Sequence, residues 1–182
     1  MSIMQIVSGS QTIFKKALEG RVFEYAVIPT SAINFSPEVQ KACKANVCGK
    51  YNNCWTCPPA IDPLEKQREK IIGFSFAFVF TTKFDLEDSF DYEGMMKAKK
   101  CHDRLTGEMH EQFGKTNPVF GAGGCNICDA CAYPAQCRFP GKTYSSIEAA
   151  GINVTELSRA GGLRYNNGEN TVTYFSMILF NS

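Results

Sequence analysis

A run of alternating aromatic and small residues marks the centre of the predicted fold. One face of the run carries four phenylalanines and the other carries small or branched residues: Phe74, Phe76, Phe78 and Phe80 against Ser75, Ala77 and Val79. Period-two alternation that is apolar on both faces is typical of a strand covered on both sides of its sheet. We therefore predict a central, buried strand in this segment.

Two further strands are predicted from runs of β-branched and aromatic residues. Residues 22–29 form the first run, which ends at Pro29 because proline cannot donate a hydrogen bond to a sheet. Residues 171–180 form the second run, near the end of the chain. We expect this last strand to lie next to the phenylalanine-rich one.

Short helices are predicted between these strands. Pro37 follows Ser36 and is suited to the first position of a helix that leads to Cys43. Residues 63–72 have a helical composition. Capping signals also occur at residues 145–148 and again at 153–156, where a pair of glycines eight residues on ends the second helix.

The longest predicted helix covers residues 90–113. An apolar stripe runs along it at three- and four-residue steps: Ala98, Cys101, Leu105 and Met109. Because a free cysteine behaves as a small hydrophobe, we expect Cys101 to pack in the core. His102 and His110 lie beside the stripe, and we expect both side chains to face solvent.

These elements predict a compact α/β or α+β fold, in which a small central sheet is flanked by helices. The chain has 182 residues, so we expect one domain over residues 1–182. Two cysteine-rich segments fall in loops next to helices, where such a sheet could bring them together. We predict that both loops bind metal.

Composition excludes several classes of partner. The formal net charge is +1 and no basic stripe is present, so we expect no nucleic-acid partner. The longest apolar run, residues 71–80, is too short to span a bilayer, so no membrane segment is expected. The first residues lack the pattern of a secretory signal, which predicts a cytoplasmic protein.

Four cysteines occur within thirteen residues of the downstream loop, three of them at a C-x2-C-x2-C spacing: Cys125, Cys128, Cys131 and Cys137. This spacing resembles the bacterial ferredoxin pattern, in which one tight loop wraps around a cubic iron–sulfur cluster. The fourth cysteine comes two residues later than in that pattern. The loop therefore predicts a [4Fe–4S] cluster, with zinc as the competing metal.

A second group of four cysteines lies upstream and ends in a C-x2-C pair followed by proline: Cys43, Cys48, Cys54 and Cys57. Two separate four-thiolate sites and two clusters that exchange ligands both fit this arrangement. A disulfide framework is disfavoured because the cysteine count, nine, is odd and no secretory signal precedes it. We expect two [4Fe–4S] clusters, with zinc as the alternative.

A glycine-rich segment, residues 121–124, precedes the downstream cysteines. Its glycines are not spaced as in a dinucleotide-binding fingerprint. We expect them to allow close approach of the backbone, with N–H groups directed at cluster sulfurs.

These motifs resemble the small predicted metal-binding proteins of the domain of unknown function 2284 family, which is common in anaerobic bacteria and archaea. Three segments carry the resemblance: Cys48 to Tyr51 with Trp55 to Pro59, then Gly121 to Pro140, then Ser145 to Val154. Together they lie within residues 43–180. The resemblance implies metal binding through the cysteines as iron–sulfur, and it assigns no reaction.

Two hypotheses of function follow, together with a structural alternative. In the first, both clusters are fully ligated and the protein transfers electrons to a redox protein partner. In the second, Cys54 is not a ligand, and an open iron acts on a small substrate that is oriented by nearby polar groups: Lys50, Tyr51, Arg138 and Lys142. In the third, zinc stabilises an interaction module. No catalytic acid or base is identified.

Overall fold

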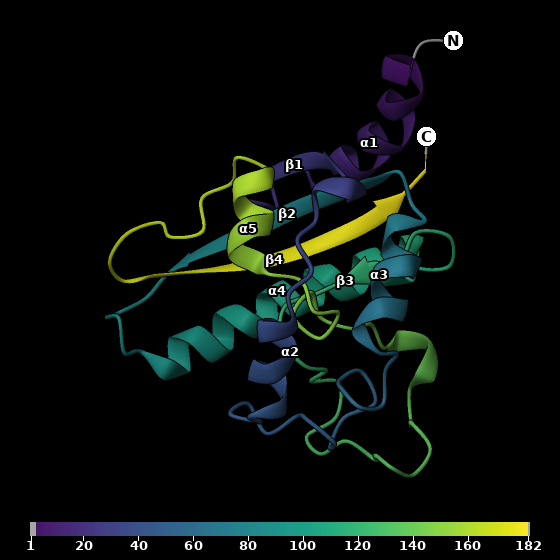
Figure 1. Cartoon of the computed structure of the whole chain (residues 1–182). Helices are drawn as coiled ribbons and strands as arrows, with labels where there is room; N and C mark the ends of the chain where they lie inside the picture. The colour runs from purple at the N-terminus through teal and green to yellow at the C-terminus, as the bar shows by residue number, and fades with distance from the viewer. Residues whose placement is uncertain (1–2, 182) are drawn as a thin grey trace.

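The computed structural model describes residues 3–181 (Figure 1). Its helices and strands follow one another in this order: α1 (Ile3–Leu18), β1 (Glu24–Pro29), η1 (Thr30–Ala32), α2 (Pro37–Lys44), α3 (Leu64–Ile72), β2 (Phe76–Asp85), α4 (Tyr92–Phe113), β3 (Val119–Phe120), η2 (Pro140–Lys142), α5 (Val154–Ala160) and β4 (Thr171–Phe180). Within these residues, no helix is both long and apolar enough to cross a membrane.

The strands form one sheet in the order β1-β2-β4-β3, and every neighbouring pair is antiparallel. The fold is therefore α+β, the second of the two predicted classes. β2 and β4 pair over their full length, from Phe76 opposite Phe180 to Asp85 opposite Thr171. This pairing confirms that the last strand lies beside the phenylalanine-rich one.

Helices cover both faces of the sheet. On one face, Phe78 and Phe80 of β2 pack in a cluster with Phe14 of α1 and with Leu105 and Met109 of α4. This arrangement confirms the prediction of a central strand that is buried on both sides, because alternate residues of β2 are fully buried in the opposite cluster.

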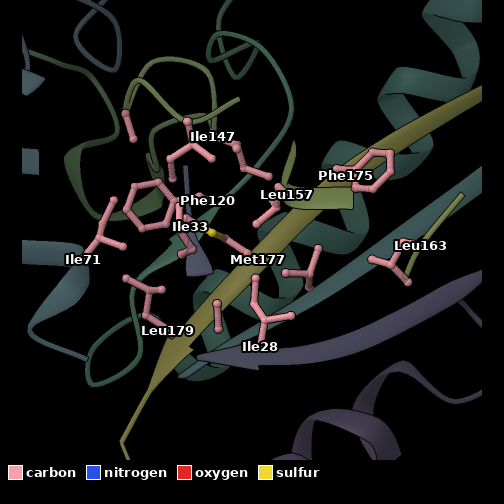
Figure 2. Close-up of a cluster of buried hydrophobic side chains, with 14 residues drawn as sticks. Ile28, Ile33, Ile71, Phe120, Ile147, Leu157, Leu163, Phe175, Met177 and Leu179 are labelled. Carbon is pink, nitrogen blue, oxygen red and sulfur yellow. The ribbon is translucent and has the colours of Figure 1, made fainter. Parts of the chain in front are cut away.

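Figure 2 shows the core on that opposite face. Ala77 and Val79 of β2 and Met177 of β4 contact Ile71 of α3 and Leu157 of α5 there. The turn at residues 147–151 and the following Ile152 complete this cluster. The same turn replaces the helix that the capping signal at residues 145–148 predicts.

The predicted helix starts are observed at two other places. The Ser36 hydroxyl accepts a hydrogen bond from the Glu38 N–H, 3.2 Å away, at the start of α2. The Asn153 side chain accepts from the N–H groups of Thr155 and Glu156 at the start of α5. Helix α1 and the two-residue strand β3 were not predicted.

The buried face of α4 differs from the predicted stripe. Cys101 is exposed, and His102 is fully buried in its place. The helix turns Ala98, His102, Leu105 and Met109 toward the sheet. The observed set is spaced by four, three and four residues, and the predicted set by three, four and four. Both spacings fit the helical repeat equally well, so periodicity alone does not distinguish between them.

Polar side chains from both central strands satisfy the buried His102 ring. Its Nδ1 lies 2.8 Å from Thr82 Oγ1, and its Nε2 lies 2.8 Å from Ser176 Oγ. Thr106 donates its only hydroxyl proton to the His102 carbonyl, so the Ser176 hydroxyl donates to Thr106 Oγ1, 2.8 Å away. His102 Nε2 therefore carries the proton, and Nδ1 accepts from Thr82.

This environment favours the neutral imidazole. Burial lowers the pKa of His102 to about 3 from its ordinary 6.5, and the charge of Lys99 acts in the same direction. At low pH the unfolded chain therefore binds one proton more than the folded chain, at this histidine. The contribution of His102 to the free energy of unfolding is complete above the unfolded pKa and is lost as the pH falls below it.

When the pH is lowered from 7 to 5, we expect the free energy of unfolding to fall by about 2 kcal/mol because of His102. Each pH unit below the unfolded pKa contributes about 1.36 kcal/mol. Urea unfolding at the two pH values measures this change. His102→Gln should remove that part of the pH dependence, and His110→Gln, which changes the other histidine, should retain it. Equal pH dependence in wild type and His102→Gln would contradict this account.

Candidate metal centre

The two cysteine-rich loops lie together at one end of the molecule. The upstream loop, residues 45–63, connects α2 to α3, and the downstream loop, residues 121–139, follows β3. Figure 1 shows both loops side by side beyond the end of α2, away from the sheet. The fold thus brings the two cysteine-rich loops together, as expected.

An aromatic pair joins the loops at their outer edge. The Trp55 indole N–H donates to the Ala135 carbonyl at 2.8 Å. The ring of Tyr133 meets Trp55 edge to face, with centroids 5.0 Å apart. The Tyr133 hydroxyl donates to Asn52 Oδ1 at 3.2 Å. Trp55 therefore links the two loops.

A second set of contacts joins the loops at the cysteines themselves. Thr56 Oγ1 accepts from the Cys125 N–H at 3.3 Å and lies 3.4 Å from Cys54 Sγ, so its hydroxyl proton is free for that sulfur. Lys50 Nζ donates to the Cys125 carbonyl at 3.2 Å. The backbone of Cys125 is thus held from both sides by the upstream loop.

Five cysteines line one small cavity between the loops: Cys54, Cys125, Cys128, Cys131 and Cys137. Four of them are the predicted downstream set, and Cys54 comes from the upstream group. The cysteines that lie together in space are therefore not the same set as those grouped in the sequence. Arg138 lines the same cavity, and its Nη1 donates to the Ala130 carbonyl at 3.0 Å.

The other upstream cysteines lie around the edge of this arrangement. The Cys57 side chain is buried. Cys43 is half-buried and its Sγ lies 3.9 Å from the Glu148 carbonyl oxygen, while Cys48 is exposed. In the described part of the chain, no group of three or more histidine, cysteine or acidic side chains is arranged to hold a metal ion.

The thiols differ in their tendency to ionise. The hydrogen bond between the Cys54 and Cys57 thiols lowers the pKa of Cys54 and raises that of Cys57. The Thr56 hydroxyl and the N–H groups of Thr56 and Cys125 lower the pKa of Cys54 further. Burial raises the pKa of Cys125. Of Cys54 and Cys57, Cys54 is therefore the thiol that ionises more readily to the thiolate.

The chemistry of the cavity fits a thiophilic metal. All five potential donors are sulfur atoms, which suit iron–sulfur clusters and zinc. The backbone at Gly124 approaches the Cys57 thiol closely, because a Cβ there would lie 3.2 Å from Cys57 Sγ and 2.8 Å from Lys50 Cγ. The close approach predicted for the glycine-rich segment is confirmed at this residue.

The predicted direction of the glycine N–H groups is wrong for two residues. The Gly121 N–H donates to the Ser145 carbonyl at 3.0 Å, and the Gly123 N–H donates to Glu148 Oε2 at 3.2 Å. These bonds fix the start of the loop to the turn that follows η2. They leave neither N–H for a sulfur atom.

Of the polar residues proposed to orient a substrate, Arg138 lines the cysteine cavity and Lys50 contacts the Cys125 carbonyl. Lys142 lies outside the cysteine cavity, 3.9 Å from Glu111 of α4. The Tyr51 N–H donates to Asn46 Oδ1 within the upstream loop. Thr56 was not predicted as a site residue. Its position between Cys54 and Cys57 was the one feature of the sequence that could have indicated it.

Comparison with protein families gives one match, which covers residues 26–180 with the description "Predicted metal-binding protein (DUF2284)". No curated protein and no solved structure matches the chain. The matched range includes both cysteine-rich loops and all of the sheet except the first two residues of β1. On this evidence, the chain belongs to the DUF2284 family of predicted metal-binding proteins.

Proposed function

We propose that this chain is an iron–sulfur protein that binds two [4Fe–4S] clusters and transfers electrons. The observation that carries the proposal is the cavity lined by five cysteines from two distant loops. Four thiolates are the usual ligand set of such a cluster, and the C-x2-C-x2-C spacing places three of them on one loop.

The first cluster would be held by the downstream set: Cys125, Cys128, Cys131 and Cys137. The second would be held by the upstream set: Cys43, Cys48, Cys54 and Cys57. Because Cys54 also lines the cavity of the first cluster, the two clusters would be neighbours. Neighbouring clusters can exchange electrons, which suits a carrier or an accessory electron-transfer subunit.

A redox protein is the partner that this role requires. Ile127 and Phe139 line the cysteine cavity, yet each is 42% exposed. Apolar side chains at the edge of a redox centre provide a dry contact surface where a partner can approach the cluster. Such clusters also fit a cytoplasmic protein of a cell that grows with little oxygen.

We expect protein purified without oxygen to contain about eight irons and eight acid-labile sulfides per chain, since each of two clusters contributes four of each. Dithionite should bleach a broad visible absorbance, as electrons enter the clusters. Metal and sulfide analysis with visible spectroscopy tests this. Colourless protein with zinc and no sulfide would overturn the redox function and favour a structural zinc module.

We expect Cys54→Ser to retain only about half of the iron and sulfide, because one of two four-thiolate sites loses a ligand. Cys101→Ser is the matched control, since Cys101 is exposed on α4 and belongs to neither group. It should keep the full content. Circular dichroism checks that both variants are folded. Full iron and sulfide in Cys54→Ser would show that Cys54 is not a ligand.

A further inference from the structure

A second cavity lies beside the cysteine cavity, between α4 and the glycine-rich segment. Its volume is about 310 Å³, at the lower end of the range for small-molecule sites. Its walls come from one face of α4, from residues 122–127, and from Lys142 and Tyr144 after the downstream loop. These segments are far apart in the sequence, and the fold alone brings them together.

Much of the wall is apolar. Met96 and Ile127, which are 37% and 42% exposed, line the cavity together with the ring of Tyr144. The Tyr144 hydroxyl donates to the Asp103 carbonyl at 3.1 Å, so the ring is fixed in place. Gly107 also lines the cavity, and a Cβ at this position would meet no atom within 4 Å. The absent side chain leaves space next to the helix.

Cationic side chains outnumber acidic ones around this space. Four cations and two carboxylates line it: Lys99, Lys100, Arg104 and Lys142 with Asp103 and Glu111. Both carboxylates already have partners, because Asp103 pairs with Lys99 and Glu111 lies 3.9 Å from Lys142. The local charge is therefore positive.

Two of the cations remain free for a ligand. Among residues 3–181, neither Lys100 nor Arg104 makes an ion pair, whereas their neighbour Lys99 does. Lys100 and Arg104 are four residues apart on one helix, so they lie on the same side one turn apart. An arginine and a lysine at this spacing can together bind a carboxylate or a phosphate group.

We propose that this cavity binds a small organic anion, whose apolar body packs against Met96, Ile127 and Tyr144 and whose anionic group is held by Lys100 and Arg104. Cys125 and Ile127 line both cavities, so the bound anion would lie directly beside the cysteine site. The binding depends on α4 and the glycine-rich segment. It goes beyond the electron-transfer function and does not require any particular metal.

Isothermal titration calorimetry on the protein as purified tests the proposal with three probes of one shape: 2-naphthoate, 2-naphthyl phosphate and the neutral 2-naphthamide. We expect one of the anions to bind with one site per chain and at least tenfold more tightly than the amide. The preferred anion distinguishes a carboxylate ligand from a phosphate ligand. Binding of neither anion, or equal binding of the amide, would overturn the proposal.

Two variants locate the site. Lys100→Gln combined with Arg104→Gln removes the charges, and Gly107→Leu places a side chain in the cavity at a position where a Cβ meets no atom within 4 Å. Each should weaken anion binding at least tenfold. Matched controls are Lys66→Gln with Arg68→Gln, two exposed residues of α3, and Gly9→Leu on α1, where a Cβ also meets no atom within 4 Å.

The controls should bind the anion within twofold of the wild type. If both cavity variants also stay within twofold, the anion binds elsewhere and the proposal is wrong. Because the titration reports binding and not redox activity, a zinc-loaded protein would overturn the electron-transfer function and still bind the anion.

Discussion

The pairing of β2 with β4 is the interaction on which the rest of this fold depends. The two strands are antiparallel neighbours along ten residue pairs, and they form the middle of the sheet. Their residues are apolar on both faces, so each face requires its own cover. Helices α1 and α4 cover one face, and α3, α5 and the turn at residues 147–151 cover the other.

This double cover leaves the two cysteine-rich loops outside the core. They contribute few large buried apolar residues, and Val47 of the upstream loop is 95% exposed. The loops are held instead by polar contacts between them, such as Trp55 with Ala135 and Thr56 with Cys125. Loops with so little hydrophobic support gain the most from metal ligation, because binding energy then becomes folding energy.

The sequence predicted the elements whose pattern is local and strongly periodic. The strand of alternating phenylalanines and the long helix α4 are examples, as is the asparagine cap of α5. The burial of His102 in the core, in place of the predicted Cys101, could not be predicted from such a local pattern. The His102 ring can be buried only because Thr82 and Ser176, distant in sequence, supply its hydrogen bonds.

The spatial arrangement of the site required the structure for the same reason. Spacing predicted two groups of four cysteines, but spacing within each loop says nothing about contacts between loops. The position of Cys54 beside the downstream cysteines results from such contacts, through Thr56. The second cavity has no sequence motif at all, because its cations and its apolar wall come from different elements.

Cys125 is the residue at which these features meet. It lines both cavities, and the upstream loop fixes its backbone through Thr56 on the N–H and Lys50 on the carbonyl. Its position therefore depends on residues that belong to neither the downstream cysteine motif nor α4. A change in the upstream loop that moved Thr56 or Lys50 would remove the hydrogen bonds that hold the Cys125 backbone between the two cavities. Because Cys125 and Ile127 line both cavities, a metal in the first and an anion in the second, as proposed, would share these two residues as neighbours.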